Sequence, residues 1–110
     1  MSIQDKIREQ VTSNRVVMYM KGTPQFPQCG FSATTVEILK RCGVTDFQAI
    51  DVLQDPDIRQ GIKDYANWPT IPQLYVKGEF LGGADIVRAM FQEGELAVLL
   101  TDKGILSAAT

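Results

Sequence analysis

The sequence contains no histidine among its 110 residues and only two cysteines, Cys29 and Cys42. The absence of histidine excludes Ser-His-Asp and Cys-His catalytic sites, and zinc sites that use imidazole ligands. Two cysteines are too few for a metal site made of four thiolates from one chain. A centre built on thiolates must therefore take some of its ligands from outside a single copy of the chain.

Long apolar stretches and clusters of basic residues are also missing. The longest apolar runs have five residues, which is too short to span a membrane. The formal net charge is -2, with acidic and basic residues interspersed, so nucleic acid is not an expected partner. The first residues have no apolar core of the kind found in secretory signals. We expect a soluble cytoplasmic protein with a single domain over residues 1–110 and a tail frayed from about residue 102.

Hydrophobic periodicity predicts alternating helices and strands. Apolar residues at helical spacing predict helices that begin near residues 3, 30, 56, 85 and 95, and we expect Ser2 and Asp55 to cap the first and third of them. Short apolar or alternating runs predict strands at 15–20, 47–52, 73–76 and 79–81. In the fourth helix we expect Ile86, Met90 and Phe91 to face the core.

This order of elements predicts an α/β fold. The first strand-helix-strand unit gives parallel strands with a right-handed crossover. A tight turn at Lys77 and Gly78 gives an antiparallel hairpin. The result is a four-stranded mixed sheet flanked by about five helices.

Cys29 stands between a loop with two prolines and the helix predicted at 30–41. The start of a helix presents unpaired N–H groups and partial positive charge, which favour a thiolate over a thiol. A Cys-x-x-Cys redox motif would have its second sulfur at position 32, where this chain has Ser32. The site therefore offers one activated sulfur rather than a two-sulfur switch. Taken alone, the pattern also fits a small buried residue, the usual place of a free cysteine.

Cys42 continues the apolar stripe formed by Val36 and Leu39, so we interpret it as a core residue rather than a redox group. If 30–41 is helical, a rise of about 1.5 Å per residue places Cys42 roughly 20 Å from Cys29. A disulfide requires Cα atoms within about 7 Å of each other. We therefore expect no disulfide between them.

Four sequence blocks together resemble the monothiol glutaredoxins of the CGFS type. They are Lys-Gly-Thr-Pro (21–24), Cys-Gly-Phe-Ser (29–32), Trp-Pro-Thr-Ile-Pro (68–72) and Gly-Gly-Ala-Asp (82–85). The resemblance covers residues 1 to about 101 and implies a single glutaredoxin domain of thioredoxin-like fold with a glutathione site. One position departs from the pattern, since many relatives have a second cysteine where this chain has Ala84. Because that turn binds glutathione through its backbone, we expect the site to be retained.

The resemblance also implies a role for individual residues. From the residues alone, Arg59 would be an ordinary solvated charge on a helix, and Pro72 would follow a trans peptide bond. The resemblance implies that Lys21 and Arg59 hold the glycine carboxylate of glutathione, and that Ile71, before the cis-proline Pro72, pairs with its cysteinyl backbone. It implies that Gly83, Ala84 and Asp85 hold the γ-glutamyl end. Cys29 would be the reactive sulfur and the iron ligand.

A count of ligands connects these residues with iron. A 2Fe-2S cluster normally needs four outer ligands, and thiolates suit it. Each chain offers the Cys29 thiolate, a bound glutathione adds a second, and two facing copies supply four. We expect a homodimer that bridges one cluster. The resemblance implies a carrier in iron–sulfur cluster biogenesis and iron homeostasis, with apo iron–sulfur recipient proteins and a BolA-like protein as partners.

Two other functions fit the same residues. Cys29 could reduce glutathione mixed disulfides as a glutathione-dependent thiol–disulfide oxidoreductase acting by a monothiol mechanism. The loop between Lys21 and Cys29 is five residues longer than in dithiol glutaredoxins, which disfavours this route and predicts at most a weak enzyme. The domain could also be a scaffold that only docks partners.

Overall fold

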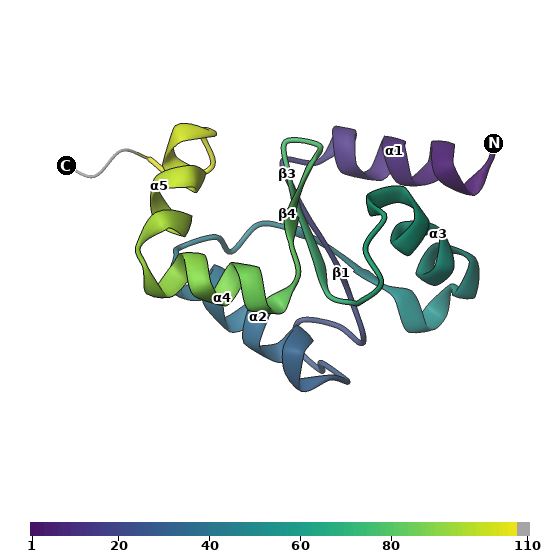
Figure 1. Ribbon diagram of the computed structural model, residues 1–110, viewed down its shortest axis with the longest axis horizontal. Coiled ribbons are helices and arrows are strands. Elements are labelled where there is room, and N and C mark those ends of the chain that lie inside the picture. The colour runs from purple at the N-terminus through teal and green to yellow at the C-terminus, as the bar shows by residue number, and fades with distance from the viewer. Residues whose placement is uncertain (108–110) are drawn as a thin grey trace.

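The computed structural model describes residues 1–107 and has one four-stranded sheet between two groups of helices (Figure 1). The predicted α/β architecture, a mixed sheet with five α-helices in this part of the chain, is confirmed. The last three residues of the predicted tail lie outside the described residues. Within residues 1–107 no helix has the length and apolar character needed to cross a membrane. The elements are α1 (Ile3–Ser13), β1 (Val16–Met20), α2 (Gly30–Arg41), β2 (Gln48–Asp51), the 3-10 helix η1 (Val52–Gln54), α3 (Pro56–Ala66), β3 (Gln73–Val76), β4 (Glu79–Gly82), α4 (Ala84–Gln92) and α5 (Glu95–Asp102).

The strands are ordered β2-β1-β3-β4 across the sheet. β1 and β2 are parallel, with Val17 opposite Gln48, whereas β3 runs antiparallel to both β1 and β4. The β3–β4 hairpin turns at Lys77 and Gly78, whose φ angles of 53° and 82° are those that a tight hairpin turn requires. The predicted parallel pair and the predicted hairpin are both confirmed.

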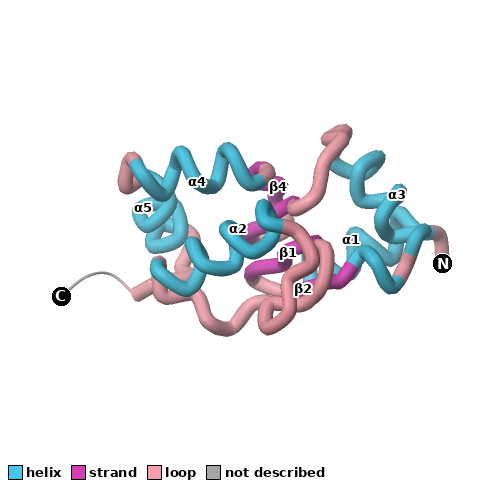
Figure 2. The backbone as a smooth tube through the Cα atoms, turned by 90° about the horizontal axis from the view of Figure 1, so that it is seen from below, coloured by secondary structure: helices cyan, strands magenta, loops and turns pink. Residues whose placement is uncertain are grey.

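The central strand β1 separates two hydrophobic clusters. Val16, Met18 and Met20 contribute to the cluster under α2, α4 and α5, against which Ile105 and Leu106 also pack. Val17 and Tyr19 point the other way, into the cluster under α1 and α3. This alternation follows from the period of two along a strand. Figures 1 and 2 agree that α1 and α3 lie on one side of the sheet and α2, α4 and α5 on the other.

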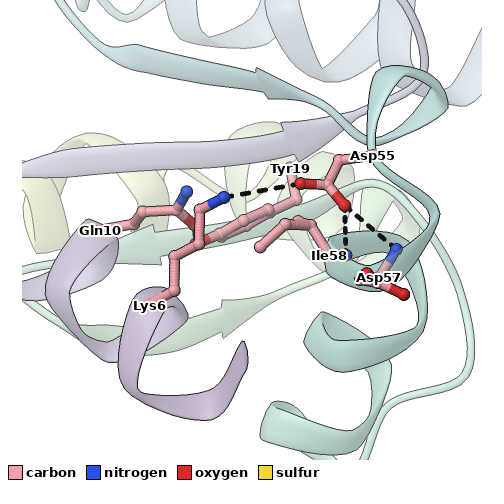
Figure 3. A network of polar contacts seen from close by, with 6 residues as sticks. All are labelled: Lys6, Gln10, Tyr19, Asp55, Asp57 and Ile58. Atoms are coloured by element: carbon pink, nitrogen blue, oxygen red, sulfur yellow. Dashed lines mark hydrogen bonds and ion pairs between the residues drawn. The ribbon is translucent and has the colours of Figure 1, made fainter. Parts of the chain in front are cut away.

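Several polar contacts lie where α1 faces the start of α3 (Figure 3). Asp55 caps α3 as predicted, because its Oδ1 accepts from two main-chain N–H groups of the first turn at 3.1 and 3.2 Å. The Asp55 Oδ2 also forms an ion pair with the Lys6 Nζ on α1, at 3.6 Å. Because both side chains are partly exposed, this pair adds little stability. On the same side, the Tyr19 hydroxyl donates to the Gln10 Oε1 at 2.7 Å. The helix α3, which contributes to the candidate site, packs against α1 through buried apolar side chains such as Ile7 and Ile62.

Two local expectations are wrong. The strand predicted at 47–52 ends at Asp51, because the Asp51 Oδ1 accepts from the Leu53 N–H at 3.0 Å and starts η1. Ile86, expected in the core, is 38% exposed, and Val87 is buried in its place. The reason is that Val87 lies three and four residues before Met90 and Phe91, which is the spacing of one helix face.

Candidate functional site

Residues from five separate segments meet in a groove of about 480 Å³, called here the Cys29 groove. Seven of the eight predicted site residues line it, and only Arg59 does not. A volume of this size is within the range of small-ligand sites. The lining residues are Lys21, Cys29, Phe31, Lys63, Trp68, Pro69, Thr70, Ile71, Pro72, Gly83, Ala84, Asp85 and Ile86.

The loop between β1 and α2 folds back on itself and brings Lys21 to the start of the helix. The Gln28 N–H donates to the Lys21 carbonyl oxygen at 2.9 Å, and Gly22 and Pro27 form an isolated antiparallel bridge. The Gly22 N–H donates to the Asp51 Oδ1 at 2.9 Å, which attaches the loop to the end of β2. Gly22 has a φ of 87°, a left-handed conformation that favours glycine. The loop is therefore held in one shape on both sides of Lys21.

Cys29 is the N-cap residue of α2, and its side chain is partly exposed. The N–H group of Ser32 is the largest cause that lowers the pKa of the Cys29 thiol, with further contributions from the Phe31 N–H, the Lys21 charge and the Ser32 hydroxyl. Burial opposes them. The Cys29 sulfur forms no N-cap hydrogen bond of ordinary geometry with the first turn of α2, so it remains available for other chemistry. The predicted thiolate-favouring environment is thus present.

Cys42 differs from Cys29 in both place and chemistry. It is a free, partly buried thiol that packs against the cluster under α2, α4 and α5. Burial raises the pKa of the Cys42 thiol, which disfavours the thiolate. These facts agree with the prediction of a core residue and no disulfide between the two cysteines.

One wall of the groove is the segment before β3. The peptide bond between Ile71 and Pro72 is cis, as the family resemblance implied. Both residues line the groove, and the Ile71 side chain is only 7% exposed. The neighbouring Gln73 is fully buried and donates through its Nε2 to the carbonyl oxygens of Trp68 and Thr70, each at 3.2 Å. These bonds hold the segment in a fixed conformation beside the sheet.

Another wall of the groove is the start of α4, next to this segment. Gly83 is the N-cap residue and has no side chain to cap the helix, so the first N–H groups of α4 lack a side-chain partner. A methyl group on Gly83 would lie 3.1 Å from the Trp68 Nε1 and 3.4 Å from the Pro72 carbonyl oxygen. The Trp68 Nε1 is itself buried and has no hydrogen-bond partner within residues 1–107. Asp85, exposed in the first turn, adds a carboxylate beside these donors.

The basic residues of the groove differ in part from the prediction. Lys21 lines the groove, whereas Arg59 is exposed on α3 outside it. Lys63, which lies four residues after Arg59 on the same helix, lines the groove instead. Lys63 was not among the site residues predicted from the sequence. The spacing of four residues, which places both side chains on one helix face, was the signal that could have identified it.

Cys29 also borders a second groove, of about 370 Å³. Gly30, Phe31, Thr34 and Arg88 help to line it, from α2 and α4. Phe31 is 63% exposed and borders both grooves. The side chain of Cys29 therefore borders two adjacent grooves, which share Phe31, Ala84 and Asp85.

Comparisons with a family model, with known relatives and with solved structures agree on the family to which this chain is similar. The family model described as Glutaredoxin matches residues 16–81. Glutaredoxin 4 of Pasteurella multocida (strain Pm70) is 55% identical over 102 residues, which is 93% of each chain. A probable monothiol glutaredoxin, GrlA, of Legionella pneumophila is 57% identical over 86 residues, or 78% of this chain and 96% of that one. The solution structure of reduced poplar apo GrxS14 is 43% identical, with a TM-score of 0.81 over 94% of each chain. The shared architecture confirms the predicted thioredoxin-like fold.

Proposed function

This chain belongs to the monothiol glutaredoxins, and from its site we propose that it binds glutathione in the Cys29 groove and carries a 2Fe-2S cluster between two copies of itself. The observation that carries the proposal is a single activated sulfur, Cys29, at the edge of a groove of suitable size for a tripeptide. The cluster is the cargo of this protein, and glutathione is the cofactor that helps to hold it.

The residues that line the groove fit the chemistry of glutathione, which has two carboxylates, one ammonium group and one thiol. Lys21 and Lys63 line the groove and would hold the glycine carboxylate, with Arg59 one turn before Lys63 as the further cation that the family pattern implies. The fit at this end is electrostatic, because lysine acts as a point charge on a flexible stem.

The other parts of the tripeptide also find matching groups. The main chain of Ile71, before the cis-proline Pro72, would pair with the cysteinyl unit in the manner of a strand edge. At the γ-glutamyl end, the uncapped N–H groups at the start of α4 suit a carboxylate. Asp85 would balance the ammonium group. This arrangement leaves the thiol of glutathione beside Cys29.

Ligand number then favours an assembly of two chains. Within residues 1–107 no three His, Cys, Asp or Glu side chains gather in a group that could hold a metal. Cys42 is a poor second ligand, because it packs against the core and burial disfavours its thiolate. One Cys29 and one glutathione make half of a four-thiolate site, and a second copy completes it. Half of the ligands would then not be covalently attached to the protein, which suits transfer of the cluster rather than storage for long periods.

The surface around Cys29 supports docking of a second protein. Phe26 and Phe31 are 74% and 63% exposed, and they flank Cys29 in the sequence. Exposed aromatic side chains of this kind are common at interfaces. We propose a second copy of this chain as the partner in the homodimer, apo iron–sulfur proteins as recipients, and a BolA-like protein as the partner in a mixed complex.

A second candidate function uses the same sulfur for catalysis, and the lowered pKa of the Cys29 thiol favours it. The thiolate would attack the glutathione sulfur of a mixed disulfide, which forms a Cys29–glutathione disulfide and releases the target thiol. A second glutathione would then reduce Cys29 and leave as oxidised glutathione. A turnover assay with a small glutathione mixed disulfide separates this function from that of a cluster carrier.

Anaerobic reconstitution with iron, sulfide and glutathione tests the proposal. The wild type is expected to become brown and dimeric, and Cys29→Ser to stay colourless. Cys42→Ser is the matched control and is expected to become brown like the wild type, because Cys42 packs away from the groove. A wild type that remains a colourless monomer with glutathione present would refute the carrier function.

A further inference from the structure

Ser32 occupies the position at which a two-cysteine redox motif has its second sulfur, and its side chain is fully buried. Its Oγ accepts a hydrogen bond from the main-chain N–H of Lys21 at 3.2 Å. This bond joins the end of β1 to the first turn of α2, across eleven positions of the sequence. The residue is therefore a structural link between Lys21 and the helix that begins at Cys29.

The Ser32 hydroxyl differs from the threonine hydroxyls of the helices in the hydrogen bond that it makes. Four helical threonines, Thr12, Thr34, Thr35 and Thr101, each donate to the carbonyl oxygen four residues earlier. Ser32 does not follow them, because it is the third residue of α2 and the residue four positions earlier precedes the helix. Among the described residues its hydroxyl donates to no carbonyl oxygen, and it is closed off from water. Among residues 1–107, the side-chain hydrogen bond of Ser32 is thus the one that its oxygen accepts from the Lys21 N–H.

We propose that Ser32 is a positioning residue whose hydroxyl oxygen accepts from the Lys21 N–H and so holds Lys21 beside the first turn of α2, where Cys29 is the N-cap residue. A serine hydroxyl has two lone pairs, so its oxygen can accept this bond from the main chain. This bridge between the end of β1 and α2 fixes the place of the Lys21 main chain relative to Cys29. Its role in glutathione binding rests on the proposed function, in which Lys21 holds the carboxylate of glutathione and Cys29 lies beside its thiol.

A second hydrogen bond holds the main chain of the loop directly after Lys21. The next residue, Gly22, donates its N–H to the Asp51 Oδ1 at 2.9 Å. Two consecutive main-chain N–H groups, those of Lys21 and Gly22, are thus each held by a side chain from a different element. Loss of the Ser32 hydroxyl would release one of the two and leave the Lys21 N–H without its partner, which is costly in a partly buried place.

The experiment compares Ser32→Ala with Ser32→Thr, which keeps the hydroxyl, and with Thr35→Val as a matched control. Thr35 is also buried on α2, but its hydroxyl donates to the Phe31 carbonyl oxygen and not to the site. The first measurement is the amide proton of Lys21 by nuclear magnetic resonance, without glutathione. Ser32→Ala is expected to shift this signal upfield and to speed its exchange with solvent about tenfold, whereas Thr35→Val leaves it unchanged.

The second measurement is the affinity for glutathione by calorimetric titration. The loss of one ordinary hydrogen bond corresponds to about a threefold to tenfold weaker affinity, so Ser32→Ala is expected in that range, with Ser32→Thr restoring it. An unchanged Lys21 amide in Ser32→Ala, or an equal change in Thr35→Val, overturns the bridge. If the Lys21 amide responds as expected but the wild type binds no glutathione, the bridge is supported and the proposed function is refuted.

Discussion

A single methyl group at Gly22 tests whether the loop before Cys29 has the shape described. In Gly22→Ala the new Cβ would lie 2.5 Å from the Phe26 carbonyl oxygen and 2.7 Å from the Gln28 nitrogen. Both are main-chain atoms, so neither can move without opening the loop. The φ of 87° adds a cost of about 1–2 kcal/mol for any residue with a Cβ. Displacement of the two main-chain atoms adds about 1–3 kcal/mol, so the free energy of unfolding is expected to fall by roughly 2–5 kcal/mol.

Thermal unfolding followed by circular dichroism measures this change. For a chain of this size the expected loss corresponds to a decrease in Tm of roughly 10 to 25 °C. Gly30→Ala is the control, because a methyl group there would have no atom within 4 Å and the residue has an ordinary helical conformation. Its Tm is expected to stay within a few degrees of the wild type. Equal Tm values for Gly22→Ala and Gly30→Ala would refute the loop geometry.

Three other predictions follow from the site and its support. The pKa of the Cys29 thiol is lowered and that of the Cys42 thiol is raised, so Cys29 is expected to be alkylated first at pH 7. Alkylation of Cys29 is also expected to reach its full rate at a lower pH than that of Cys42, and mass spectrometry after timed alkylation measures both rates. Lys63→Gln is expected to weaken glutathione binding by about threefold to tenfold, and Arg59→Gln by less, because only Lys63 of the two lines the groove. Titration calorimetry measures both affinities, and a larger effect of Arg59→Gln would contradict this order. Asp55→Ala removes the cap of α3 and is expected to cost about 1 kcal/mol, seen as a decrease in Tm of about 4–8 °C, and an unchanged Tm would contradict the capping role.

The sequence was sufficient for the elements whose signals are local. The helix Gly30–Arg41 agrees with the prediction at both ends, and Gly43, just past its end, has the positive φ expected there. The hairpin turn follows from the Lys77 and Gly78 pair in the same way. In each case the deciding residues are neighbours along the chain, so no knowledge of the rest of the fold was needed.

Features that depend on contacts between distant segments were less predictable. The direction of Ile86 depends on how α4 lies over the sheet, and periodicity alone placed it in the core when it lines the groove instead. The presence of Lys63 in the groove depends on the rotation of α3, which its apolar packing against α1 helps to set. The position of Ser32 shows the same limit, since the sequence revealed the absence of a second sulfur but not the hydrogen bond to Lys21.

Native mass spectrometry after anaerobic purification in the presence of glutathione tests the central claim most directly. The account predicts one species that contains two chains, two glutathione molecules and one 2Fe-2S cluster, and that is lost in Cys29→Ser. A cluster bound to a single chain, or a dimer that holds the cluster without glutathione, would contradict the ligand set of two Cys29 and two glutathione thiolates.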